Sequence, residues 1–275
     1  EPTVVVRVPE SPTREDARDA LRLLKDLVND FPFPSDAHRS AWVAALLSVL
    51  ARPAIDGPVP LTLVDANERG SGKSLLCDVI GVILSGRRLP RRTAPDEPAE
   101  WRKAMLAIAI AADPVILIDN VTRTLRSDAL DTVLTGTEYR ERALGRNKEV
   151  VAEVRTVFLA TSNNATLSTD LVRRSIHVRL EAGEDPARRT GFRHPDLLGH
   201  VRDDRALYLA AALTVLRAHV VAGRPIVPLR PMGSYDAWSS VVRAAIVWAG
   251  WPDPADTQDG LRDSSEPERD DLEAV

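Results

Sequence analysis

The stretch from Asp65 to Leu76, DANERGSGKSLL, constrains the fold more than any other part of the chain. It follows a short apolar run, VPLTLVD over residues 59–65, and leads into KSLLCDVIGVIL, whose apolar residues recur at helical spacing. A buried strand, a glycine-rich loop and a helix in this order are the context that a phosphate-binding loop requires. The sequence therefore predicts an α/β unit that binds phosphate at the N-terminus of a helix.

The loop has the spacing of a Walker A motif except at its first position. Gly70 and Gly72 let backbone N–H groups close around phosphate oxygens, and Lys73 would reach the β- and γ-phosphates. Ser74 would bind Mg²⁺. Asn67 stands where the usual pattern has glycine, and we expect the turn to survive because asparagine tolerates left-handed backbone conformations. The residues expected around the phosphates are Asn67, Glu68, Arg69, Gly70, Ser71, Gly72, Lys73, Ser74 and Leu75. The alternative, a glycine-rich turn with an incidental lysine, is disfavoured by the strand and helix on either side.

A second apolar strand, PVILID over residues 114–119, ends in the acid that a phosphate loop needs for its metal ion. Asp119 would hold Mg²⁺ directly or through water, as in a Walker B motif. Asn120 follows, where many related ATPases carry a carboxylate that activates the attacking water. An asparagine side chain can orient a water molecule but cannot take its proton. The general base is therefore open, with Glu68 and Glu138 as candidates.

Two further motifs place polar side chains after apolar segments. FLATSNN ends a third strand, and Asn163, with Asn164 as second choice, would position the attacking water; a simple strand-ending turn is the alternative. DLVRRSIHVRL places Arg173 and Arg174 at a helix end before a fourth strand. There a guanidinium could stabilise transition-state charge on a neighbouring subunit's nucleotide. Alternatively, the two arginines are a solvated pair favoured by the helix dipole.

The order of elements predicts a parallel sheet flanked by helices, the α/β fold class of P-loop NTPases. The predicted strands are residues 59–65, 114–119, 154–161 and 175–180, and the predicted helices are 13–31, 35–50, 73–84, 99–112, 127–145, 195–222 and 233–249. We expect four parts, namely an N-terminal helical segment (1–58), the ATPase core (59–182), a C-terminal helical domain (183–252) and an acidic flexible tail (253–275).

Composition limits which partners the chain could bind and in which cellular compartment it could act. The net charge of −4 combines a tail of −7 over residues 253–275 with a remainder of +3, so the overall charge does not argue against nucleic acid. Cys77 is the single cysteine, which excludes an internal disulfide, and no zinc-binding pattern is present. No apolar run is long enough to span a membrane, and we expect a cytoplasmic protein. Because the chain begins at Glu1 without methionine, we expect a fragment of a longer protein or a processed product.

Taken together, the motifs resemble those of AAA+ ATPases. More narrowly, the chain is similar to the helicase part of primase-helicase proteins of phages, plasmids and integrated elements, which are related to superfamily 3 helicases. The resemblance covers about residues 20–255 and lies in VDANERGSGKSLL, VILIDNV, RALGRN, FLATSNN, DLVRRSIHVRL and GSYDAWSSVVRAAIVWAGWPDP.

The resemblance implies an assembly and a substrate. It implies a homo-oligomeric ring, expected to be a hexamer, that hydrolyses ATP with Mg²⁺ between subunits and moves on single-stranded or forked DNA. It also implies a primase-type module upstream in the same chain. A hairpin before the third strand, over about 142–154, would touch DNA through Arg146 and Lys148 near its tip; alternatively, these two residues are ordinary solvated charges.

Other functions remain open from the sequence. One is a loader or remodeller of the same ATPase class without strand separation. Another is a regulatory nucleotide-binding module that hydrolyses ATP poorly, a possibility that Asn120 keeps open. A small-molecule P-loop kinase is disfavoured by the C-terminal helical region and the arginine pair. A second basic cluster, GRRLPRRT, could touch phosphates, pair with a neighbouring subunit or only keep the surface soluble; its arginines are Arg87, Arg88, Arg91 and Arg92.

Overall fold

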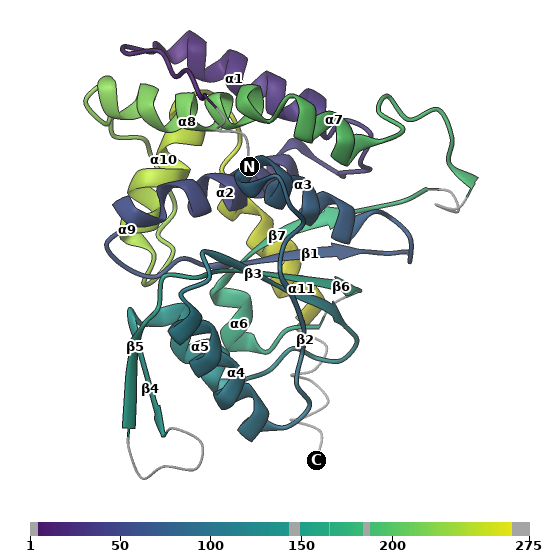
Figure 1. The fold of residues 1–275 in the computed structure, drawn as a ribbon, viewed down its shortest axis with the longest axis vertical. Helices are drawn as coiled ribbons and strands as arrows, with labels where there is room; N and C mark the ends of the chain where they lie inside the picture. The colour runs from purple at the N-terminus through teal and green to yellow at the C-terminus, as the bar shows by residue number, and fades with distance from the viewer. Residues whose placement is uncertain (1–4, 143–148, 165, 184–187, 266–275) are drawn as a thin grey trace.

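A five-stranded parallel sheet separates two layers of helices (Figure 1). The computed structural model describes residues 5–142, 149–164, 166–183 and 188–265. In spatial order the strands are β2 (Arg91–Thr93), β3 (Val115–Val121), β6 (Val157–Asn163), β1 (Leu61–Ala66) and β7 (Ser175–Leu180). All neighbouring strands pair in parallel. The predicted α/β fold of P-loop NTPases is confirmed.

Helices from both ends of the chain cover one face of the sheet. They are α1 (Arg14–Leu27), α2 (Asp36–Ala51), α3 (Lys73–Ser85), α7 (Leu197–Asp203), α8 (Arg205–Val221), α9 (Asp236–Trp238) and α10 (Ala244–Trp248), with a π-helical turn over Ser239–Arg243. In Figure 1, α1 runs along α8 although the two are far apart in sequence. Trp238 of α9 donates its Nε1–H to Ser48 Oγ of α2 at 2.7 Å. The N-terminal helices of residues 1–58 and the C-terminal helices of residues 183–252, which we expected to be separate parts, contribute to one hydrophobic core.

The opposite face carries α4 (Pro98–Ala111), α5 (Asp128–Thr135), α6 (Thr169–Arg173) and α11 (Gln258–Ser265). A two-stranded antiparallel hairpin, β4 (Glu138–Arg142) with β5 (Glu149–Glu153), is inserted before β6. The predicted helix over 127–145 was wrong beyond Thr135, because Gly136 ends α5 and residues 138–142 alternate between exposed and more buried positions. The hairpin that the resemblance implied is present, but Arg146 and Lys148 lie outside the described residues.

The expected flexible tail was also wrong for its first part. Residues Pro254–Thr257 form a 3₁₀ turn that continues into α11 along the outer edge of β7. His177 donates its backbone N–H to Thr257 Oγ1 at 3.0 Å, and Gln258 Nε2 donates to the Ser175 carbonyl at 2.9 Å. Covering an edge strand in this way prevents it from pairing with another chain. The edge contacts override the acidic composition that suggested disorder, and residues 266–275 lie outside the described part.

No helix in the described part of the chain is long and apolar enough to cross a membrane.

Candidate nucleotide-binding site

The glycine-rich loop, Asp119 and Asn163 meet where three neighbouring strands end. The glycine-rich loop follows β1, Asp119 lies near the end of β3, and Asn163 is the last residue of β6. Asn163 pairs in register with Ala66, the residue directly before the loop. Because parallel strands present their carboxyl ends at one edge, the sheet order β3-β6-β1 brings residues distant in sequence into one site.

The loop needs glycine at two positions for backbone reasons. Gly70 and Gly72 have φ of 81° and 87°, in the left-handed region that side chains disfavour. Helix α3 begins directly afterwards at Lys73, so its N-terminus faces the loop. A Cβ added to Gly72 would lie 2.9 Å from Cε1 of Phe31, which packs over the loop. The loop is thus held between β1, α3 and the segment that follows α1.

Asn67 occupies the first loop position for a different reason from the one expected. It is not among the described residues with a left-handed φ. Instead, its side-chain Nδ2 donates to the Ala182 carbonyl and its Oδ1 accepts the Ala182 N–H, both at 3.0 Å. Its backbone N–H donates to the Leu180 carbonyl at 3.3 Å. Asn67 therefore fastens the start of the loop to the chain leaving β7, a role that glycine could not fill.

Lys73 lies buried at the centre of the site. Its Nζ donates to Asn163 Oδ1 at 2.5 Å and lies 3.5 Å from the Glu68 carbonyl. Burial lowers the pKa of Lys73 below its ordinary value, although the charges of Asp65 and Asp119 act in the opposite direction. The contact with Asn163 joins the Walker A lysine to the predicted sensor residue. A phosphate held by Lys73 would therefore lie beside the Asn163 amide.

Asp119 is held by three donors. Ser74 Oγ and Thr161 Oγ1 donate to Oδ1 at 2.9 and 2.6 Å, and Arg91 Nη1 donates to Oδ2 at 2.9 Å. Burial acts to raise the pKa of Asp119. The hydrogen bonds from Thr161 and Ser74 and the charge of Arg91 outweigh this effect and hold the pKa below its ordinary value. The carboxylate is therefore ionised and fixed in orientation. Sequence reasoning missed Thr161, although it lies within the FLATSNN motif.

Asn120 lies at an irregularity in β3. Its φ is 58°, its side chain is exposed, and its backbone N–H donates to Thr161 Oγ1 at 2.8 Å. The pairing of β3 with β6 shifts register between Ile118 and Val121, which turns Asn120 out of the strand. Thr161 thus connects both residues of the Asp-Asn pair.

The two candidate bases differ in position. Glu68 is exposed within the glycine-rich loop itself. Glu138 begins β4 of the hairpin, pairs with Arg140 at 3.3 Å, and lies near the start of β6 rather than its end. Glu138 is therefore at the end of the sheet opposite Asp119, and only Glu68 remains near the site.

Asn164 faces a separate ion pair. It has a φ of 49°, and its Oδ1 accepts from Arg179 Nη2 at 3.1 Å. Arg179 of β7 also pairs with Asp65, the buried acid near the end of β1. Asn163 rather than Asn164 is therefore the residue that contacts Lys73. The Asp65–Arg179 pair became recognisable only once β1 and β7 were known to be neighbours.

The two predicted arginines have different surroundings. Arg174 pairs with Asp131 of α5 and lies 3.8 Å from Asp170, so it is engaged within its own chain. Arg173 is the last residue of α6 and its side chain is exposed. The Arg174 carbonyl accepts the backbone N–H of Leu61, which places the pair beside the start of β1. The glycine-rich loop follows the other end of β1, which spans six residues or about 20 Å.

A cavity of about 320 Å³ adjoins Gly70–Gly72. Its wall is largely apolar, with contributions from Phe31, Leu75, Phe192 and Leu197. It is formed by the end of α1, the loop and the segment entering α7. Aromatic and aliphatic side chains beside a phosphate loop suit a flat, apolar group such as a nucleobase.

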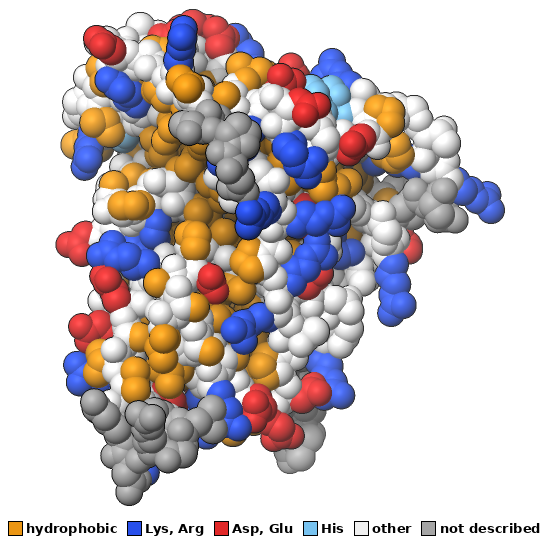
Figure 2. Space-filling view, in the orientation of Figure 1, with side chains coloured by type: hydrophobic (Ala, Val, Ile, Leu, Met, Phe, Trp, Pro, Cys, Tyr) orange, Lys and Arg blue, Asp and Glu red, His pale blue; other side chains and the backbone are white. Residues whose placement is uncertain are grey.

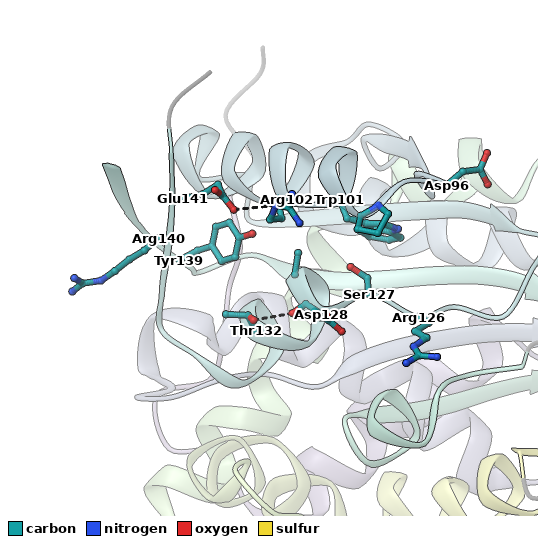
Figure 3. Close-up of a pocket in the computed structure, with 12 residues that line it drawn as sticks. Asp96, Trp101, Arg102, Arg126, Ser127, Asp128, Thr132, Tyr139, Arg140 and Glu141 are labelled. Atoms are coloured by element: carbon teal, nitrogen blue, oxygen red, sulfur yellow. Dashed lines mark hydrogen bonds and ion pairs between the residues drawn. The ribbon is translucent and has the colours of Figure 1, made fainter. Parts of the chain in front are cut away.

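A second hollow of about 430 Å³ lies between α4, α5 and β4 (Figure 3). Trp101 and Tyr139 form part of its wall, and Arg102 pairs with Glu141 across 3.6 Å. None of the predicted motif residues lines it, and it is separate from the candidate nucleotide-binding site.

The residues present fit a metal ion that is shared with a nucleotide. Ser74 Oγ and Asp119 Oδ1 are oxygen ligands of the kind that Mg²⁺ prefers. Among the described residues no group of three or more His, Cys, Asp or Glu side chains could hold a metal. A Mg²⁺ ion bound here would therefore take its other ligands from phosphate and water, as Mg²⁺ commonly does.

The basic cluster is partly turned inward. Figure 2 shows Lys and Arg side chains on the face where α3 leads into β2. Arg91 pairs with Asp119 and Asp78, and Arg88 lies 3.4 Å from Asp78. Charge on this segment thus serves partly to balance acids of the site, an outcome that the sequence left open.

Comparison with known proteins gives matches among solved structures alone. No family model matches the chain, and no curated protein does. The C-terminal region of NrS-1 is 14% identical with a TM-score of 0.41, covering 77% of this chain and 48% of its own. SCCmec type IV Cch, described as an active helicase, is 12% identical with a TM-score of 0.44, covering 94% and 51%. The chain thus spans about half the length of each. At these identities the likeness concerns the fold alone.

Proposed function

We propose that this chain is the ATP-hydrolysing motor of a DNA-translocating protein, the helicase part of a mobile-element primase-helicase. One observation carries the proposal. Lys73, Ser74, Asp119 and Asn163, which lie on three different elements, make direct contacts in one site. A glycine-rich turn with an incidental lysine would have no reason to place these side chains together.

The contacts support a proposed role for each group. Backbone N–H groups of the loop and the N-terminus of α3 would bind the phosphates, with Lys73 between the β- and γ-phosphates. Ser74 and Asp119 would hold Mg²⁺, which when bound neutralises charge on the phosphate oxygens. Asn163 would orient the attacking water beside the γ-phosphate. The apolar cavity next to Gly72 would take the adenine ring.

Arg173 supports hydrolysis between subunits. About 20 Å of β1 separates it from its own glycine-rich loop, too far for a side chain to reach the nucleotide of the same chain. We therefore propose that this exposed guanidinium acts on the nucleotide of a neighbouring subunit, and hence that the chain forms a homo-oligomer. We propose a ring, and the family resemblance favours six subunits. Arg174, paired with Asp131, would hold the end of α6 in place.

The hairpin β4–β5 is the proposed DNA contact. It is inserted directly before β6, and the segment between its strands includes Arg146 and Lys148. Positive side chains there would bind phosphates of single-stranded DNA irrespective of sequence.

A second function, a regulatory or loader-type nucleotide-binding module without helicase activity, is favoured by Asn120. The residue after Asp119 has no carboxylate to accept a proton, and Glu138 lies at the far end of the sheet. Such a site would bind ATP well and hydrolyse it slowly.

One experiment separates these functions. ATP turnover is measured with and without single-stranded DNA, alongside the mass of the assembly in ATP and Mg²⁺. A motor should form oligomers and hydrolyse ATP faster with DNA. A regulatory module should bind ATP but turn it over slowly with no response to DNA, and a monomer that hydrolyses at full rate would exclude the ring mechanism.

A further inference from the structure

Arg91 connects the Asp119 carboxylate to a second, buried acid. It lies on β2, the short strand at the edge of the sheet beside β3. Its Nη1 donates to Asp119 Oδ2 at 2.9 Å and its Nη2 donates to Asp78 Oδ2 at 2.5 Å. One guanidinium thus bridges an acid of the candidate metal site and an acid of α3.

Asp78 gives this bridge a fixed anchor. Its side chain is 1% exposed, and its Oδ1 accepts the backbone N–H of Leu89 at 3.3 Å. A buried carboxylate needs charged or hydrogen-bonding partners to offset its lost hydration, and here Arg91 is the closest cation, with Arg88 at 3.4 Å. The contact of Nη2 with Asp78 therefore fixes the guanidinium plane of Arg91, and Nη1 reaches Asp119.

The contact completes the restraint on the Asp119 side chain. Ser74 and Thr161 both donate to Oδ1. These two hydrogen bonds therefore fix Oδ1 but leave the position of Oδ2 less restricted. Arg91 is the donor on Oδ2. Fork-shaped guanidinium groups match two carboxylate partners in a way that a lysine ammonium cannot.

We propose that Arg91 is a positioning residue, which orients the Asp119 carboxylate and lowers by its positive charge the affinity of the site for the divalent cation. This inference rests on the proposed function, since it concerns the same metal site. Orientation should act on turnover, whereas charge should act on metal affinity. The two effects therefore have opposite signs when the residue is removed, and a loosened fold would not produce that combination.

The test uses Arg91→Gln, Arg91→Lys and a matched control, Arg92→Gln. Arg92 is exposed and adjacent on β2, so the control removes the same charge from the same strand. Two quantities are measured for each: Mn²⁺ binding in the presence of ADP, by electron paramagnetic resonance, and kcat for ATP with Mg²⁺. Urea unfolding checks that each variant is folded.

Arg91→Gln should lower the half-saturating Mn²⁺ concentration by about two- to fivefold, the range for a partly exposed charge pair. It should also lower kcat by about ten- to hundredfold, because the carboxylate is displaced. Arg91→Lys keeps the charge and loses the fork, so its Mn²⁺ affinity should stay near wild type while kcat still falls.

Three results would overturn the inference: Mn²⁺ affinity in Arg91→Gln that equals or falls below that of Arg92→Gln, an unchanged kcat in Arg91→Gln, or full kcat in Arg91→Lys. A wild type that binds Mn²⁺ with ADP but does not hydrolyse ATP overturns the proposed ATPase, and the Mn²⁺ titration then decides the role of the Arg91 charge by itself. A wild type that binds no Mn²⁺ with ADP overturns both.

Discussion

Replacing Gly72 with alanine tests how the glycine-rich loop is built. Gly72 has a φ of 87°, and its added Cβ would lie 2.9 Å from Cε1 of Phe31. Two costs therefore add. A left-handed residue with a side chain costs about 1–2 kcal/mol, and forcing extra volume into a packed contact costs about 1–3 kcal/mol. Gly72→Ala should lower the free energy of unfolding by about 2–5 kcal/mol in total, a large part of the roughly 5–15 kcal/mol of a typical domain.

Helix α3 supplies a matched control at its other end. Gly86 has a φ of 76°, but a Cβ there would meet nothing within 4 Å. Gly86→Ala should therefore cost only the backbone part, about 1–2 kcal/mol. Urea unfolding followed by tryptophan fluorescence measures both variants. Adding Phe31→Leu to Gly72→Ala should recover about 1 kcal/mol or more relative to the sum of the single changes, since the ring atoms that clash are removed.

The outcome that would refute this reasoning is specific. If Gly72→Ala costs no more than Gly86→Ala, or if Phe31→Leu and Gly72→Ala are additive, Phe31 does not press on the loop.

The remaining predictions concern catalysis and pH. Arg173→Ala should reduce ATP turnover about 10³-fold, as expected for an arginine finger, and mixing it with Lys73→Ala should restore part of the rate. Arg174→Ala should mainly lower the free energy of unfolding, by about 1.5–3 kcal/mol, because its ion pair is internal; equal loss of turnover in both variants would contradict the assignment. Asn120→Ala should slow hydrolysis with ATP binding retained in equilibrium titrations, and a strong rise in turnover for Asn120→Asp would favour the regulatory module. Burial lowers the pKa of His38 to about 4, so between about pH 6.5 and 4 the unfolded chain binds a proton that the folded chain does not. Stability should fall as pH drops through this window, by at most about 1.4 kcal/mol per pH unit from this residue, and His38→Asn should flatten the dependence in urea titrations at several pH values.

The sequence was informative where chemistry is encoded locally. The loop residues with expected roles lie within five consecutive positions, namely Gly70, Gly72, Lys73 and Ser74. Their roles depend only on a strand before them and a helix after them. The Asp119 strand was readable for the same reason. Joining these segments required only the rule that parallel strands end at one edge of a sheet.

Sequence reasoning failed where a contact depends on which strands are neighbours. Arg91 reaches Asp119 because β2 lies beside β3, and Thr161 does so because β6 lies on the other side. No spacing in the sequence indicates this order. Likewise, the contacts of Gln258 with the edge of β7 override an acidic composition that suggested disorder. Asn67 was expected to preserve the turn through its tolerance of left-handed conformations, whereas its amide pairs with Ala182, which lies more than 100 residues later in the chain.

The most direct test of the account is ATP turnover by wild type, Lys73→Ala and Asp119→Ala, each with Mg²⁺ and with or without single-stranded DNA. We expect wild type to hydrolyse ATP and to be stimulated by DNA. Both variants should lose hydrolysis, Lys73→Ala because the charge on the phosphates is removed and Asp119→Ala because the metal ligand is removed, while urea unfolding shows that they remain folded. Turnover at the wild-type rate in either folded variant would contradict the account.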